Sequence, residues 1–159
     1  MSASGNASPT RPFEGRRDRQ RGAAAVEFAL VFPLFVAVLM GTIDYGYYFF
    51  SDQIVTNAAR EGARAGTLVT PGVGASAAAV SAASAAAATY LTNNGLGCPG
   101  GGSGCITATS TTVSDLAGIT TPAVDVVIDY ATVSLTGFTG YILPTKVHAH
   151  SVMRWQWAP

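Results

Sequence analysis

An apolar run, AAAVEFALVFPLFVAVLMGTI, occupies residues 23–43 and contains a single charged residue, Glu27. Its apolar side chains fall on every side of a helix, whereas a helix on the surface of a soluble domain normally has a polar face. At ~1.5 Å per residue, these 21 residues would span about 32 Å, close to the ~30 Å hydrocarbon core of a bilayer. The pattern therefore predicts a transmembrane helix over residues 23–44. The alternative is a helix buried in a soluble core.

The segments on either side of this run indicate how it is oriented. Residues 1–22 are polar and lack an apolar period, so we expect a leader without regular structure. Its arginines outnumber its acidic residues and predict a cytoplasmic N-terminus, while aromatic residues on the other side suit the far membrane interface. Those aromatic residues are Tyr45, Tyr47, Tyr48, Phe49 and Phe50. The sequence thus predicts a single-pass inner-membrane protein whose C-terminal part is exported to the periplasm or the exterior.

A cleaved secretory signal is a competing explanation for the same run. The run exceeds the ~7–15 apolar residues of such a signal, and no small-x-small cleavage site closes it. Ordinary signal cleavage is therefore disfavoured.

Beyond the membrane the helical pattern continues over residues 45–70 and stops at Pro71. Within it Ala58, Gly62 and Gly66 recur at four-residue spacing, which lets another helix approach closely. The alternative is an Ala- and Gly-rich helix on the surface.

The remaining residues, 71–159, are expected to form an exported head that begins with a second helix. Residues 75–92 are Ala-rich and have an apolar face that we expect to pack thinly against the first helix. The residues near that face are Val80, Ala83, Ala87 and Leu91.

The last third of the chain is rich in β-branched and aromatic residues of alternating polarity, punctuated by glycine and proline. This pattern predicts three strands within residues 105–157, in the runs 105–113, 123–135 and 145–157. Three strands alone bury little, so one face of the sheet should pack on the helices. The predicted fold class is α+β: a long N-terminal transmembrane and stalk helix, a second Ala-rich helix and a small antiparallel sheet.

Composition and charge narrow the function classes further. Hydrophobic residues make up 48% of the chain and charged residues only 11%, well below the ~25% charged residues usual in soluble proteins. Basic and acidic residues balance at nine each, so a protein that coats nucleic acid is disfavoured. The composition argues against an ordinary soluble enzyme.

The junction between the basic leader and the apolar run carries the most informative chemistry. Gly22 is followed by the small residue Ala23, and Glu27 is the fifth residue when counted from Ala23. This arrangement resembles the cleavage site of type IV prepilins. The resemblance implies that a prepilin peptidase cuts after Gly22 on the cytoplasmic side.

A physical argument gives Glu27 a role in assembly. An ionised carboxylate in hydrocarbon is unfavourable unless it is paired. Cleavage after Gly22 would create a positive α-ammonium group at Ala23, with which Glu27 of a neighbouring subunit could pair. The alternative is a glutamate tolerated near the membrane edge, where it pairs with Arg21 or reaches the interface.

The resemblance can be followed over residues 21–64. The features that carry it are Arg21-Gly22, Glu27-Phe28, Pro33, the turn-like IDYG at 43–46 and NAAREGAR at 57–64. This segment resembles the TadE-like family, the pseudopilins of tight-adherence (Tad, or Flp-type) pilus systems. Because proline removes a backbone donor, we expect Pro33 to bend the helix and fit it into a curved bundle. The alternative for Pro33 is no assembly role.

The resemblance implies a pilin-like fold and a minor pilin or pseudopilin that helps to initiate or tip the pilus, or acts in a related secretion apparatus. The implied partners are a prepilin peptidase, other pilins or pseudopilins of the same system, the inner-membrane platform of the pilus machine and the lipid bilayer. The alternative function is an uncleaved single-pass anchor that displays a small exported binding domain.

Two cysteines, Cys98 and Cys105, flank a glycine-rich loop on the exported side. Oxidising compartments favour their pairing, so we expect a disulfide across the loop 98–105. Two free thiols or a metal-binding pair are the alternatives.

His148 and His150 alternate along a strand and point to one face, where Asp125 or Asp129 could join them as metal ligands. We favour exposed sheet residues over a metal site. Neither acid has a nucleophile or a phosphate-binding loop beside it, so we expect no catalytic site, no metal, no cofactor and no direct contact with nucleic acid.

Overall fold

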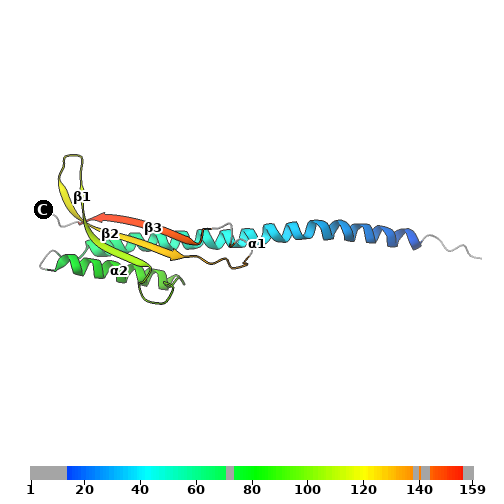
Figure 1. Ribbon diagram of the computed structural model, residues 1–159, viewed down its shortest axis with the longest axis horizontal. Coiled ribbons are helices and arrows are strands. Elements are labelled where there is room, and N and C mark those ends of the chain that lie inside the picture. Colours follow the sequence, from blue (N-terminus) through cyan, green and yellow to red (C-terminus); the bar gives the residue numbers. More distant parts are fainter. Residues whose placement is uncertain (1–13, 71–73, 138–139, 141–143, 156–159) are drawn as a thin grey trace, which may run out of the picture. The chain divides into compact units, whose positions relative to one another are not determined.

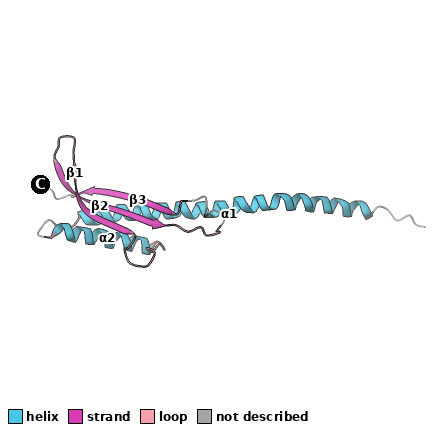
Figure 2. Cartoon of the chain, in the orientation of Figure 1, coloured by secondary structure: helices cyan, strands magenta, loops and turns pink. Residues whose placement is uncertain are grey.

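The computed structural model of the chain describes residues 14–70, 74–137, 140 and 144–155, with side chains from Gly22 onward. Two helices are followed by three strands (Figures 1 and 2). They are α1 (Glu14–Thr67), α2 (Ala75–Asn93), β1 (Ile106–Ser114), β2 (Thr120–Ala131) and β3 (Lys146–Arg154). The α+β class predicted from the sequence is confirmed. The chain divides into an N-terminal unit, Met1–Leu39, and a C-terminal unit, Met40–Pro159.

In the N-terminal unit, α1 begins at Glu14, within the segment expected to be an unstructured leader. That expectation is wrong for residues 14–22, while residues 1–13 lie outside the described part of the chain. Arginine, glutamine and glutamate are good helix formers, and extending an existing helix avoids the cost of nucleating one. The helix also continues through Pro33.

The apolar part of α1 exposes large side chains all around the helix. Phe28, Leu30 and Leu34 are each more than 60% exposed. By length and composition α1 is suited to cross a membrane, and it is consistent with the predicted single span. An all-round apolar surface of this kind is stable only against lipid or other apolar helices.

In the C-terminal unit, the three strands form an antiparallel sheet in the order β1-β2-β3. The central strand β2 alternates strictly over its last part: Val124, Val126 and Ile128 are fully buried, while Asp125 and Asp129 point to the opposite face. One face of the sheet therefore carries the core and the other is polar, as the period of two predicts.

The core joins this face of the sheet to one side of each helix. From α1 it takes apolar residues between Ile54 and Ala63, and from α2 it takes every fourth residue. The buried residues of α2 are Ala79, Ala83, Ala87 and Leu91. Ala79 thus occupies the place that the sequence assigned to Val80, which is only half-buried. The smaller side chain suits the close approach of α1.

Two glycines of α1 mark where this approach is closest. A Cβ atom on Gly62 would lie 2.8 Å from the carbonyl oxygen of Ala83, and one on Gly66 would lie 3.0 Å from that of Ala79. Ala58, one turn before Gly62, is fully buried. The line of small residues thus lies against the backbone of α2.

The far end of the C-terminal unit is closed by Trp155. Its indole Nε1 donates a hydrogen bond to the carbonyl oxygen of Val69 (2.9 Å), and its backbone N donates to Pro122 (2.8 Å). These contacts join the end of β3 to the segment after α1 and to the start of β2.

A disulfide joins Cys98 to Cys105, with Cα atoms 5.4 Å apart, as the sequence predicts. Gly100, Gly101 and Gly102 all adopt positive φ in the loop between them. A side chain would strain the backbone there, which accounts for the glycine-rich composition.

Candidate functional site

The predicted processing and assembly residues lie on consecutive turns of α1. Gly22, Ala23 and Glu27 are all exposed, and Glu27 stands between Val26 and Phe28, which are 68% and 65% exposed. Ala23 and Glu27 are four residues apart, so they share one face of the helix. The structure thus presents a carboxylate within an apolar surface, where it favours a positively charged partner.

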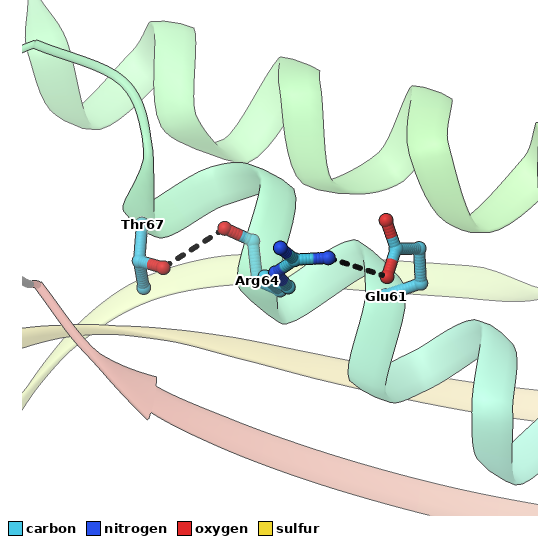
Figure 3. A network of polar contacts seen from close by, with 3 residues as sticks. All are labelled: Glu61, Arg64 and Thr67. Atoms are coloured by element: carbon cyan, nitrogen blue, oxygen red, sulfur yellow. Dashed lines mark hydrogen bonds and ion pairs between the residues drawn. The ribbon is translucent and has the colours of Figure 1, made fainter.

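Near the end of α1 the polar contacts are local. The Arg64 guanidinium lies 3.7 Å from the Glu61 carboxylate, and the Thr67 hydroxyl donates a hydrogen bond to the carbonyl oxygen of Arg64 (Figure 3). Both charged side chains are about half exposed, so the pair adds at most about 1 kcal/mol. These contacts among Glu61, Arg64 and Thr67 stabilise the last turns of α1, and we assign no ligand to them.

The sequence pattern gave no role to Asp44, yet the structure buries its carboxylate and surrounds it with hydrogen-bond donors. It is 2% exposed and accepts hydrogen bonds from the Ser134 hydroxyl (2.6 Å), the Thr136 hydroxyl (2.7 Å) and the Thr136 backbone N–H (3.0 Å). Charge-assisted bonds of this kind are about twice as strong as neutral ones. Asp44 therefore fastens the connection between β2 and β3 to α1.

The IDYG motif around Asp44 looked turn-like in the sequence, and that interpretation is wrong. Residues 43–46 lie inside α1. Glycine tolerates a helix interior at a cost of ~1 kcal/mol, which the packing of the surrounding helix outweighs. The available signal was an aspartate placed directly after a 21-residue apolar run, where a carboxylate needs partners.

Aromatic side chains surround α1 just after Asp44. The rings of Tyr45 and Phe49 lie 6.2 Å apart and those of Tyr47 and Phe50 lie 6.3 Å apart. Tyr45, Phe49 and Phe50 are 44–58% exposed. Amphipathic and apolar rings at this level suit a membrane interface.

One of these tyrosines also reaches the sheet. Burial raises the pKa of the Tyr130 hydroxyl above its ordinary value of 10.0, and the nearby Tyr47, to which it is hydrogen-bonded, adds to the shift. Tyr47 and Asp44 thus bind the same end of the sheet to α1.

The two histidines of β3 pair with the acids of β2 on the open face of the sheet. His148 Nδ1 lies 2.8 Å from Asp129 Oδ1, and His150 Nε2 lies 2.9 Å from Asp125 Oδ1. The cross-strand register places Asp129 directly opposite His148, whereas His150 is opposite Val127 and contacts Asp125 diagonally. Within the described residues no three His, Cys, Asp or Glu side chains converge in a way that could hold a metal ion.

These features define a class of protein. A long apolar N-terminal helix leads into a second helix and a three-stranded antiparallel sheet that packs against it, which is the α+β arrangement of pilin-like proteins. The apolar run 23–43 of this helix carries the exposed carboxylate of Glu27, and Asp44 binds the connection after β2 to the same helix.

Within this class, residues 22–64 match the model of a family described as TadE-like protein. The N-terminal segment is therefore TadE-like, and the resemblance drawn from the sequence is confirmed over these residues. The match suggests a protein associated with a Tad pilus. No curated protein and no solved structure matches the chain.

Proposed function

We propose that the chain is a TadE-like minor pilin or pseudopilin that takes part in initiating or tipping a Tad/Flp-type pilus, or a related secretion apparatus, after cleavage by prepilin peptidase. The observation that carries this proposal is the TadE-like match over residues 22–64, which covers the basic-to-apolar junction and the exposed apolar surface of α1. An apolar helix exposed on all sides suits a subunit that passes from lipid into a helical assembly.

The proposed topology is a single pass through the inner membrane. The arginines before Gly22 favour a cytoplasmic N-terminus, and the Cys98–Cys105 disulfide supports an oxidising, exported location for the C-terminal unit.

In this proposal Glu27 guides assembly. Cleavage after Gly22 leaves an α-ammonium group on Ala23, one helical turn before Glu27. When two subunits stack with an axial offset of about one turn, the carboxylate of one meets the ammonium group of the next, and both charges are neutralised within the apolar array.

The proposed partners follow from this role. They are a prepilin peptidase, other pilins or pseudopilins with similar apolar helices, the inner-membrane platform and the lipid bilayer. The small-residue line of Ala58, Gly62 and Gly66 already lies against α2, so we assign it to packing within the subunit.

One observation favours the alternative of an uncleaved anchor that displays a binding domain. The helix α1 is continuous across the bond between Gly22 and Ala23, so a peptidase can reach that bond only after the helix opens locally.

Intact mass of the membrane-extracted protein, produced with and without an active prepilin peptidase, separates the two functions. We expect the peptidase to leave a chain that starts at Ala23, and Gly22→Val to block the cut. Gly41→Val is the matched control, because an added Cβ atom meets no atom within 4 Å at either glycine. A full-length chain in the presence of the active peptidase would support the anchor.

A further inference from the structure

The connection between β2 and β3 exposes apolar side chains although it is firmly anchored. Val133 is 64% exposed and Leu135 is 58% exposed. Between and after them, Ser134 and Thr136 bind the buried carboxylate of Asp44. The segment therefore alternates: its polar side chains turn toward α1, and its apolar side chains turn away from the protein.

Further hydrogen bonds fix the shape of this segment. The Ser134 hydroxyl accepts from the backbone N–H of Gly137 (2.8 Å), and Gly137 has a φ of 72°, which favours glycine. The Thr132 hydroxyl donates to the carbonyl oxygen of Pro144 (2.8 Å). The exposure of Val133 and Leu135 is thus imposed by the fold.

The position of Asp44 in the sequence indicates that Val133 and Leu135 lie near the membrane interface. Asp44 directly follows the apolar run 23–43, whose ~32 Å length matches the hydrocarbon core. Residues held beside Asp44 therefore lie where α1 leaves the membrane, at the level of Tyr45 and Phe49. In Figure 1 the segment that directly follows β2 runs beside α1, in agreement with the hydrogen bond between Ser134 and Asp44.

We infer that Thr132–Gly137 is a second membrane-contacting element, held by Asp44 so that Val133 and Leu135 enter the lipid interface beside the exit of α1. Side chains of this type partition into the apolar part of the interface while the polar backbone stays near the headgroups. The inference rests on the membrane placement of α1 in the proposed function.

The two cysteines of the chain are both in the disulfide, so an introduced cysteine is the single free thiol. We would label Val133→Cys and Leu135→Cys with an environment-sensitive fluorophore in the full chain, reconstituted in vesicles of phosphatidylethanolamine and phosphatidylglycerol. A fraction of the lipids would carry a nitroxide quencher high on the acyl chain. We expect a blue-shifted emission and strong quenching at both positions.

Two further positions serve as controls. Leu116, in the turn between β1 and β2, is fully exposed and precedes the start of β2, whereas Val133 and Leu135 follow its other end, so Leu116→Cys should show no lipid quenching. Phe35→Cys, within the apolar part of α1, should be quenched by a nitroxide deep in the acyl chain.

The outcomes separate the inference from the function on which it rests. Quenching at Phe35→Cys without quenching at Val133→Cys and Leu135→Cys would overturn the inference and leave the membrane span intact. A blue shift without quenching would point to a protein contact and would also overturn it. Absence of quenching at Phe35→Cys would overturn the membrane placement, and the inference with it.

A variant of the anchor tests its part in the mechanism. Asp44→Asn, introduced together with Leu135→Cys, offers fewer acceptors to the donors of Ser134 and Thr136, so the segment should leave the interface and lipid quenching should be lost. Asp52→Asn, also on α1, should leave the quenching unchanged. Equal quenching in the two variants would overturn the role of Asp44 as the anchor.

Discussion

At Asp44 a single carboxylate joins two parts of the chain that are about 90 residues apart in sequence. Its burial would be unfavourable on its own, and three hydrogen bonds from two loop residues make it favourable. Glu27, by contrast, is exposed on the apolar surface of the same helix. The first carboxylate stabilises the subunit, and we assign the second to contacts between subunits.

We expect Asp44→Asn to lower the free energy of unfolding of the C-terminal unit by about 1.5–3 kcal/mol, because hydrogen bonds to a buried charged acceptor are weakened or lost. Urea denaturation of the full chain in detergent micelles would measure the change. Asp52→Asn is the control on the same helix, where the half-buried side chain should tolerate the change. Similar losses in the two variants would contradict the role assigned to Asp44.

The Tyr47–Tyr130 pair predicts an alkaline loss of stability. The pKa of Tyr130 is raised in the folded state, so the folded protein holds this proton more tightly than the unfolded chain does. Protonated Tyr130 makes its full contribution to the free energy of unfolding below the unfolded-state pKa of 10.0. This contribution is lost as the pH rises through the higher folded-state pKa.

Tyr130→Phe should therefore be less sensitive to alkaline pH than the unsubstituted protein when denaturation midpoints are compared on both sides of pH 10.0. Tyr90→Phe, on α2, is the control for the loss of a tyrosine elsewhere. An identical fall in all three proteins would show that other groups control the alkaline transition.

At the scale of the elements, α1 packs closely against α2 because Gly62 and Gly66 of α1 have no side chains. Gly62 lies against the backbone of Ala83, and Gly66 lies against both Ala79 and Val124 of the sheet. Alanine at every fourth position of α2 keeps the two helix axes close. Helix propensity alone would favour alanine over glycine at both α1 positions, so the packing outweighs it.

Gly62→Ala should destabilise the C-terminal unit by about 1–3 kcal/mol, because the new Cβ would lie 2.8 Å from a backbone oxygen that cannot move freely. Gly46→Ala, in the same helix, meets no atom within 4 Å and should stabilise by about 0.5–1 kcal/mol through helix propensity. Thermal unfolding of both variants measures this difference in sign. Stabilisation by Gly62→Ala would refute the close contact.

At the scale of the whole molecule, the described chain combines an apolar helix that lacks a polar face with a C-terminal unit that has a well-packed core. In the proposed function, the exposed apolar surface of α1 lies first in lipid and then in an assembly of similar helices. In our proposal Glu27 gives the assembly its axial register, because unpaired charges inside an apolar array are unfavourable.

Glu27→Gln should reduce pilus assembly strongly while leaving membrane insertion at its normal level, because the amide removes the charge that meets the neighbour's ammonium group. Electron microscopy of piliated cells and the membrane fraction of the protein measure the two effects separately. Glu61→Gln, which disturbs only a half-exposed ion pair, should assemble normally. Normal piliation with Glu27→Gln would remove the pairing role of this carboxylate.

The sequence by itself determined the features that depend on local pattern. The all-round apolar run predicted the long N-terminal helix, and the period of two predicted three strands. The two cysteines that flank a glycine-rich loop on the expected exported side predicted the disulfide. Each of these depends on residues that are close in the chain, so the pattern is visible without the fold.

Only the tertiary structure decided which residues meet across long separations. In the structure Ala79 is buried where the pattern predicted Val80. Asp44 lies in a helix and not in a turn, and it binds Ser134 and Thr136. Tyr47 contacts Tyr130 of the sheet. Such contacts depend on the register of helix against sheet, which is set by close packing of many side chains at once. The polarity pattern along the chain does not determine the register of helix against sheet.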